Sequence, residues 1–227
     1  MRLDTLNRAI LGQITKSTDR GAQTLIGPSE IGGCPYCVGE TVALQFPDLY
    51  PDLKKEERFS LAAWVGTGVH LNLDHTLEIE GAIKEKKNVI AEIEGYGTIK
   101  GSTDLYVEPH VFDYKVLGKW KFDKMRLEYL EKPKRIPDTK HRVQQMLYGY
   151  GWKKLGYDVK SVNIVAIPKE SNDPRDIRFY TEKYNEKLAV AALDRLVKIL
   201  ENVKEGKLED LPSDEDCYTC SRITFRI

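Results

Sequence analysis

The chain has 227 residues, of which 41% are hydrophobic and 31% are charged. This length and composition predict one globular domain with a sizeable core. The 35 basic and 35 acidic residues cancel, so any nucleic-acid contact must come from local clustering of charge. No apolar run approaches the roughly 20 residues of a membrane helix. The N-terminus lacks the apolar segment of a secretory signal, so we expect a cytoplasmic location.

The first part of the chain is predicted to be helical or irregular. A short amphipathic helix is expected at the N-terminus, with an apolar face formed by Leu3, Leu6, Ile10 and Ile14. Residues 20–57 contain several Gly and Pro, which indicate loop with short helical pieces. Ser60 is expected to cap a helix from Leu61 to Glu80. Its apolar stripe is formed by Leu61, Trp64, Val65 and Val69.

The rest of the chain alternates between strand-like and helix-like segments. The predicted strands are Asn88–Glu94, Thr98–Glu108, Val111–Leu117 and Ser161–Pro168, with a further strand at Asp176–Thr181. The predicted helices run from Asp138 or Thr139 to about Leu155, and from Glu186 to Val203. This order predicts an α/β (α+β) fold in which helices flank a sheet.

Two carboxylates and a lysine are expected to converge on one hairpin. We place its turn between Glu108 and Pro109. Asp104 then lies opposite Asp113, and opposed residues point to the same face of a sheet. Lys115 is two residues beyond Asp113 and shares that face. Such carboxylates hold Mg²⁺ or Mn²⁺ for phosphodiester hydrolysis, and the lysine stabilises the developing charge. Alternatively, these side chains simply face solvent on an exposed hairpin.

Four short motifs occur in an order that is typical of one nuclease family. They are Gly66-Thr-Gly-Val-His70, Gly101-Ser-Thr-Asp104, Asp113-Tyr-Lys115 and Gln144-Gln-Met-Leu-Tyr148. With these motifs the chain resembles the RecB-like branch of the PD-(D/E)XK nucleases, closest to the CRISPR-associated RecB-type exonucleases and their stand-alone phage relatives. The resemblance implies a restriction-endonuclease-like core, a central mixed sheet flanked by helices, as a single nuclease domain over residues 1–227. It also implies a bacterial or phage-infected cell.

The resemblance assigns a role to each motif residue. His70, Asp104 and Asp113 would bind the catalytic metal, with the Tyr114 carbonyl as a further ligand. Lys115 would be the catalytic lysine. Gln144 and Tyr148 would position the substrate or the lysine, and residues four apart on a helix do share a face.

The four cysteines form two pairs, Cys34-Pro-Tyr-Cys37 and Cys217-Tyr-Thr-Cys220. Together they predict one site for zinc or an iron–sulfur cluster that joins the N- and C-terminal segments. The family resemblance favours a [4Fe–4S] cluster over zinc, although related nucleases distribute one cysteine early and three late. The alternative is four reduced cysteines without a ligand.

A basic stretch follows the third predicted strand. Between Lys115 and Arg142 there are ten basic and four acidic residues, a local net charge of +6. Lys119, Lys121 and Lys124 lie among the aromatic residues Trp120, Phe122 and Tyr129. Lysines that bind phosphates and aromatic rings that stack on bases are typical of a binding groove for single-stranded nucleic acid. A solvated loop with a hydrophobic anchor is the alternative.

These observations favour a metal-dependent DNA exonuclease that acts on single-stranded or frayed ends in recombination, repair or phage DNA metabolism. A structure-specific endonuclease or nickase is the closest alternative. A non-catalytic DNA-binding adaptor with the same fold, or a structural protein stabilised by zinc, would belong to other classes.

Overall fold

The computed structural model of the chain describes residues 25–54, 60–215, 217, 219 and 220, together with Thr5, Arg8 and Leu11. The predicted N-terminal stripe of Leu3, Leu6, Ile10 and Ile14 lies outside the described residues. Within the described ranges, no helix has the length and apolarity needed to cross a membrane.

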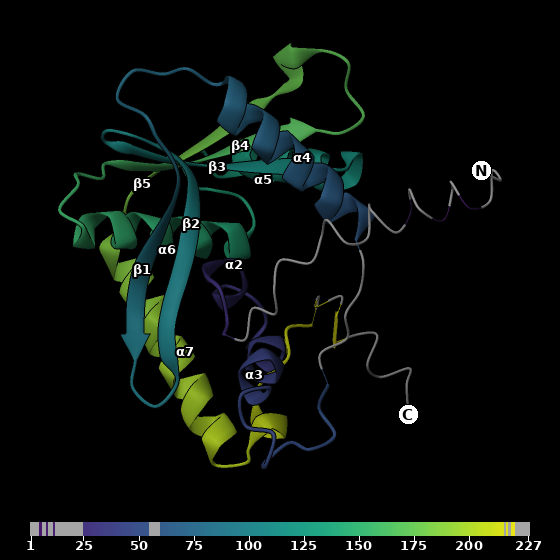
Figure 1. Cartoon of the computed structure of the whole chain (residues 1–227), viewed down its shortest axis with the longest axis vertical. Coiled ribbons are helices and arrows are strands. Elements are labelled where there is room, and N and C mark those ends of the chain that lie inside the picture. The colour runs from purple at the N-terminus through teal and green to yellow at the C-terminus, as the bar shows by residue number, and fades with distance from the viewer. Residues whose placement is uncertain are drawn as a thin grey trace.

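A five-stranded sheet with the strand order β1-β2-β3-β4-β5 forms the centre of the molecule (Figure 1). Neighbouring strands are antiparallel except β3 and β4, which are parallel. The sheet is therefore mixed, as predicted. Its strands are β1 (Ile83–Ile93), β2 (Gly97–Val107), β3 (His110–Leu117), β4 (Ser161–Pro168) and β5 (Arg178–Lys183).

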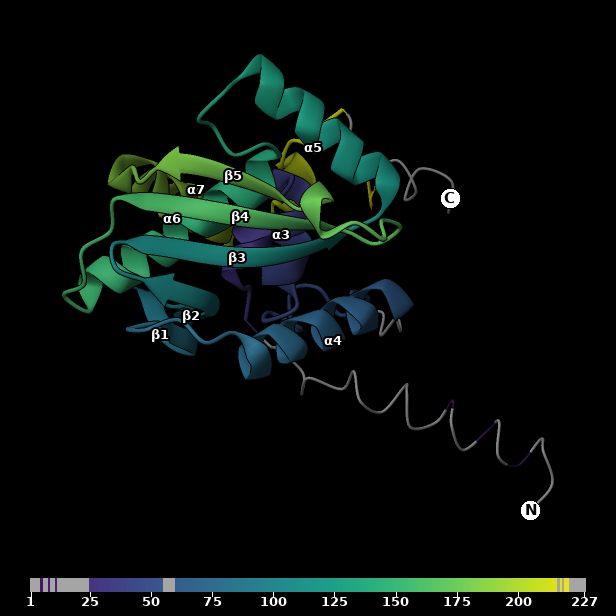
Figure 2. The ribbon, with the colours of Figure 1, turned by 90° about the horizontal axis from the view of Figure 1, so that it is seen from above.

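Helices cover both faces of the sheet, as Figure 2 shows from above. The helices are α2 (Pro28–Ile31), α3 (Pro35–Ala43), α4 (Leu61–Thr76), α5 (Lys119–Glu131), α6 (Thr139–Lys154) and α7 (Glu186–Lys204), with short 3₁₀ turns at Pro174–Asp176 and Leu208–Asp210. The main core lies between the sheet and α3, α6 and α7. In it, the rings of Tyr106 and Trp152 stack with 4.2 Å between centroids. A smaller cluster around Leu105, Tyr114 and Val165 lies on the face that α4 covers.

Helix α6 is the best predicted element of the fold. It begins at Thr139, and the Asp138 side chain caps it by accepting from the backbone N–H of His141 at 3.2 Å. Its apolar residues Met146 and Leu147 are fully buried. The helix is enclosed on nearly all sides because it contacts α2 and α7 as well as strands of the sheet. Strand β4 and helix α7 also form where the sequence predicts them.

Helix α4 differs from its prediction in two respects. Ser60 caps it as expected, by accepting from the Ala63 N–H at 3.2 Å. However, it ends at Thr76 rather than at Glu80. None of its residues is buried, so the predicted stripe is not a core face. Its packing comes instead from its C-terminal end, where Leu73 and Leu77 contact the smaller cluster.

Two further elements were predicted incompletely or not at all. Strand β1 begins at Ile83 instead of Asn88, because its charged first half pairs with β2 in spite of a low strand propensity. Helix α5 was not predicted, because it has no continuous apolar stripe. Of its residues only Phe122 and Met125 are buried, three positions apart on one turn.

Candidate active site

The predicted catalytic residues lie where strands β2 and β3 separate. The ladder between these strands has only three pairs near the turn: Leu105↔Phe112, Tyr106↔Val111 and Val107↔His110. Extending this register places Asp104 opposite Asp113, as the sequence predicts. The N–H of Tyr114 has no place in this short ladder, and it donates to the Asp104 carboxylate with 2.6 Å between N and Oδ2. The Asp104 side chain therefore fills the fork between the strands and satisfies a backbone donor that would otherwise be buried without a partner.

Asp113 connects the strand residues with helix α6. Its side chain is buried, and its Oδ2 lies 2.6 Å from Nζ of Lys115. Its Oδ1 accepts from Nε2 of Gln144 at 3.3 Å, and the same nitrogen donates to the Tyr148 hydroxyl at 2.9 Å. The structure thus brings the Asp-x-Lys and Gln-x-x-x-Tyr motifs into direct contact.

His70 and Glu85 surround the other carboxylate. Nδ1 of His70 lies 3.2 Å from Oδ1 of Asp104, and the His70 ring meets the Tyr114 ring edge-on with 5.8 Å between centroids. His70, Glu85 and Asp104 each offer a ligand atom, and these three atoms lie within 4.8 Å of one another. One imidazole nitrogen with carboxylate oxygens is a donor set that suits Mn²⁺ or Mg²⁺.

Glu85 is a site residue that the sequence analysis missed. It lies on β1, and the register of the β1–β2 ladder places it opposite Asp104. Its backbone is left-handed, with φ of 46°, which is uncommon for a residue other than glycine. The Ser102 hydroxyl donates to its Oε2 at 3.1 Å. The predicted strand began at Asn88 and so excluded Glu85; a strand extended toward Ile83 would have placed it across from Asp104.

The charges and pKa shifts of these acidic side chains and His70 favour a bound cation. Burial raises the pKa of Asp113 to about 6; the charge of Lys115 opposes this shift, and that of Asp104 adds to it. Burial and then the charge of Asp104 also raise the pKa of Glu85. Burial disfavours the charged form of His70, but the hydrogen bond to Asp104 and the charges of Asp104 and Asp113 together outweigh burial and raise the pKa of the imidazole. A divalent cation would relieve the repulsion among these acids.

Gly101 allows close packing around its motif, whereas Gly66 and Gly68 have no such role. A Cβ on Gly101 would lie 2.7 Å both from Cγ of Pro28 and from Cε1 of Tyr148, closer than real contacts. The backbone of β2 therefore passes tightly between α2 and the tyrosine of α6. At Gly66 and Gly68 on α4, no described atom lies within 4 Å of an added Cβ. These two glycines permit no close backbone contact within the described part of the chain.

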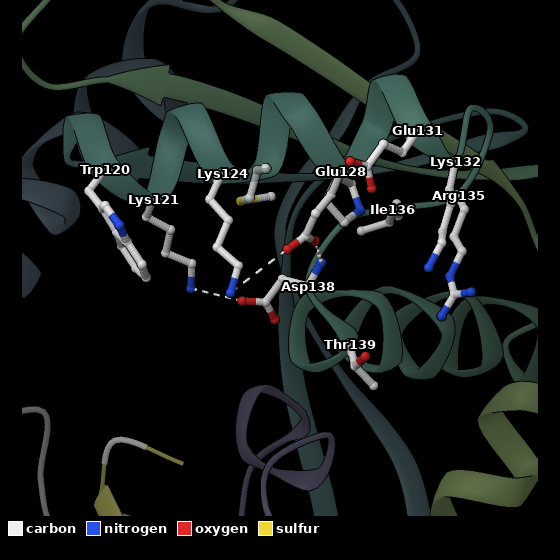
Figure 3. A pocket seen from close by; sticks show the side chains of 12 residues that line it. Trp120, Lys121, Lys124, Glu128, Glu131, Lys132, Arg135, Ile136, Asp138 and Thr139 are labelled. Atoms are coloured by element: carbon white, nitrogen blue, oxygen red, sulfur yellow. Dashed lines mark hydrogen bonds and ion pairs between the residues drawn. The ribbon is translucent and has the colours of Figure 1, made fainter. Parts of the chain in front are cut away.

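A basic groove, here called the α5 groove, lies between α5 and the start of α6 (Figure 3). It has a volume of about 580 Å³. Figure 3 shows Trp120, Lys121 and Lys124 extending into it from α5, with Lys132 and Arg135 at its other end. Acidic residues also line it, and each predicted DNA lysine is paired with an acid. The pairs are Lys119–Asp123 at 2.9 Å, Lys121–Asp138 at 3.0 Å and Lys124–Glu128 at 3.8 Å.

The three predicted stacking aromatics have different environments. Trp120 is 76% exposed, with Nζ of Lys124 5.6 Å from the centre of its ring. Phe122 belongs to the main core, which corrects its assignment to a DNA track. Tyr129 packs against the Tyr180 ring with 5.1 Å between centroids. Of these three residues, only Trp120 offers an open ring face for a base.

His141 shows that the α5 groove and the catalytic group are neighbours. Burial lowers the pKa of this imidazole to about 3, and the positive charges of both Lys121 and Lys115 contribute to the shift. Lys121 lines the groove, and Lys115 contacts Asp113. The two sites therefore lie within Coulombic range of one ring.

The structure also brings together all four cysteines. Figure 1 shows the C-terminal segment beside α3, and the four Sγ atoms lie within 4.8 Å of one another. All four cysteines are free of disulfides. Burial opposes ionisation of Cys217, but hydrogen bonds from the backbone and thiol of Cys220, the thiol of Cys37 and the backbone of Thr219 together outweigh this effect and lower its pKa to about 7.

The chain was compared with protein families, curated proteins and solved structures. No protein-family model matches the chain, and no curated protein is significantly similar in sequence. The crystal structure of an alkaline exonuclease from Laribacter hongkongensis is 11% identical, with a TM-score of 0.54 over 94% of this chain and 99% of that one. The complex of that exonuclease with dAMP is 14% identical, with a TM-score of 0.53 over 83% and 91% of the two chains.

A structure from Eubacterium rectale, described as a candidate exonuclease, is 12% identical, with a TM-score of 0.50 over 90% of this chain and 92% of that one. At such identities the likeness concerns the fold. The mixed sheet and flanking helices of this chain align with these structures over most of its length, and the predicted α/β fold is confirmed. The chain shares its overall fold with these exonuclease structures.

Proposed function

We propose that the protein is a metal-dependent exonuclease that hydrolyses phosphodiester bonds at DNA ends. The observation that carries this proposal is the convergence of Asp104, Asp113 and Lys115 at the fork of β2 and β3, with Gln144 and His70 in contact with the two carboxylates. A non-catalytic adaptor would not need a complete set of acids with a lysine at 2.6 Å. The fold of the exonuclease structures supports the same reading.

His70, Glu85, Asp104 and Asp113 would hold Mg²⁺ or Mn²⁺, with the Tyr114 carbonyl as a further ligand. The bound metal would activate a water molecule and neutralise charge on the phosphate. The imidazole favours Mn²⁺ over Mg²⁺, because nitrogen is a softer ligand than oxygen. The resemblance alone supplies the Tyr114 carbonyl as a ligand.

Lys115 and the two α6 residues have separate tasks in this proposal. The Lys115 ammonium would stabilise the negative charge that develops on the phosphate in the transition state. Gln144 orients Asp113 through its amide hydrogen bond. Burial and the nearby charge of Asp113 raise the pKa of Tyr148, so its hydroxyl stays protonated and remains a hydrogen-bond donor to a phosphate oxygen.

Single-stranded DNA is the substrate that the α5 groove favours. Lys121 and Lys124 would leave their acidic partners and bind phosphate oxygens of the strand. A base would stack on the exposed ring of Trp120. The groove adjoins the catalytic group because α5 begins directly after β3, the strand of Asp113 and Lys115. The complex of the Laribacter hongkongensis exonuclease with dAMP supports a deoxynucleotide substrate.

Digestion of end-labelled linear and circular single strands tests the proposal. With Mn²⁺ or Mg²⁺, linear strands should be shortened from an end while circles stay intact, and EDTA should stop the reaction. Lys115→Ala should be inactive on the same strands, whereas Lys160→Ala, a distant exposed lysine, should be unaffected. Cleavage of circles would show an endonuclease. Binding of DNA without metal-dependent turnover would show an adaptor.

A further inference from the structure

The four cysteine sulfurs are closely spaced. The Sγ of Cys37 lies 3.6 Å from that of Cys217 and 3.4 Å from that of Cys220, and Cys34 and Cys220 are 3.6 Å apart. All four sulfurs fall within 4.8 Å of one another. These separations constrain what the sulfurs can surround.

We propose that the four cysteines hold one tetrahedral metal ion, zinc, instead of the [4Fe–4S] cluster that the family resemblance implies. Zinc binds thiolates at about 2.3 Å, and four sulfurs at the corners of a tetrahedron of that radius are about 3.8 Å apart. The three close pairs in the structure lie within about 0.4 Å of this value. The two-plus-two pairing of the cysteines is also the ligand pattern of many structural zinc sites.

A four-iron cluster does not fit the same sulfurs. Each thiolate of such a cluster binds a different iron, so a core of four irons and four sulfides has to fit between the cysteines. Here three of the sulfur pairs are already in van der Waals contact. The cysteines would have to move apart on both chain segments to admit the core.

The backbone around the sulfurs supports bound thiolates. Cys34 is the N-cap residue of the nine-residue helix α3, and Cys37 lies in its first turn, where the helix dipole favours negative charge. The N–H of Asp214 points at Sγ of Cys34 at 3.3 Å. The carbonyl of Asp214 accepts from the N–H of Cys217 at 2.9 Å, which closes a turn within the C-terminal segment. Such donors to a ligating atom are usual around metal sites.

The ion would clamp the C-terminal segment onto the N-terminal helices. Gly39 of α3 allows Leu211 and Leu208 to pack against the helix, because a Cβ there would clash with Cδ1 of Leu211. Helix α7 also contacts this region, because the Arg195 guanidinium donates to the carbonyl of Gly33 at 2.9 Å. The metal would join Cys37 to Cys217 across 180 residues of chain, a long loop whose closure stabilises the fold.

Metal analysis of anaerobically purified wild-type protein tests this proposal independently of the nuclease reaction. We expect one zinc per chain that is released when the thiols are modified, no inorganic sulfide, and no broad absorption near the blue end of the visible range. Protein grown with Co²⁺ in place of zinc should show the charge-transfer absorption of a tetrahedral thiolate site. Four irons with four sulfides would overturn the proposal, as would iron without sulfide or an absence of metal at the thiols.

Variants assign the zinc to the cysteines rather than to the catalytic group. Cys217→Ser should lose the thiol-dependent zinc, while Thr219→Ala, an exposed residue between the same cysteines, should keep it. Asp104→Asn should also keep it, because it changes only the catalytic group. Retention of zinc in Cys217→Ser together with its loss in Asp104→Asn would place the ion at the other site and contradict the proposal. If Cys217→Ser does not fold, the Asp104→Asn measurement and the Co²⁺ spectrum still decide the assignment.

Discussion

Replacement of Gln144 by leucine tests how α6 supports the metal site. Gln144 is buried, and its amide nitrogen donates to both Asp113 and Tyr148. Leucine has a similar volume, so Gln144→Leu removes the two hydrogen bonds without opening a large cavity. It leaves one carboxylate oxygen of Asp113 without this donor, and that oxygen belongs to a proposed metal ligand.

The size of the effect follows from these contacts. A buried polar group that loses its partner costs about 1–3 kcal/mol, so the metal-free protein should unfold more easily by about that amount. Loss of a group that orients a metal ligand typically lowers metal affinity or activity about 10–100-fold. Because Gln144 acts by positioning Asp113, high Mn²⁺ concentrations should recover much of the activity. A rise in the Mn²⁺ concentration needed for half-maximal rate is therefore expected, more than a fall in the maximal rate.

The next residue of the helix provides a matched control. Gln145 is fully buried, and neither of its amide atoms has a hydrogen-bond partner among the described residues. Gln145→Leu should therefore leave the Mn²⁺ dependence unchanged and should not destabilise the fold. Calorimetric Mn²⁺ titration and end-labelled DNA digestion would measure both variants. Equal Mn²⁺ affinities for Gln144→Leu and wild type would refute a positioning role for Gln144.

Three other perturbations address the rest of the site. Glu85→Gln should weaken Mn²⁺ binding by about tenfold or more while the protein stays folded, and an unchanged calorimetric titration would exclude Glu85 as a ligand. Because burial raises the pKa of Asp113 to about 6, protons compete with the metal below that pH, so Mn²⁺ affinity should fall as pH is lowered from about 7 to 5; a flat profile would contradict this. Lys119, Lys121 and Lys124 of α5 can be replaced together by alanine. This triple variant should reduce the slope of log affinity for single strands against log salt by up to about 2. An unchanged slope would locate the DNA elsewhere.

The sequence predicts the elements of this fold where local pattern and tertiary packing agree. Helix α6 has a capping aspartate, Asp138, and a stripe of apolar residues that meets the sheet. Helix α5 lacks such a stripe, and its position depends on Phe122 and Met125 reaching a core that other segments form. The charged start of β1 is held by its pairing with β2, which single-sequence propensity does not register.

The site is predictable to the extent that it depends on strand register. The hairpin turn and the alternation of side chains were enough to place Asp104 opposite Asp113, with Lys115 on the same side. Glu85 was missed because the charged start of β1 has a low strand propensity, so the predicted strand began at Asn88 and did not reach the position opposite Asp104. The spacing of the cysteines predicted a metal site, but only the sulfur separations distinguish one ion from a cluster.

The central claim is that the carboxylates at the fork of β2 and β3 perform metal-dependent hydrolysis of DNA. It is tested most directly by Asp113→Asn in a single-turnover assay on an end-labelled strand, at saturating Mn²⁺ and with Asp123→Asn, a half-exposed acid on α5, as the control. Loss of about 4 kcal/mol of transition-state stabilisation lowers the rate about 10³-fold. We expect that loss in Asp113→Asn with folding and DNA binding retained, and a wild-type rate in Asp123→Asn. A folded Asp113→Asn variant that cleaves DNA at the wild-type rate would contradict the account.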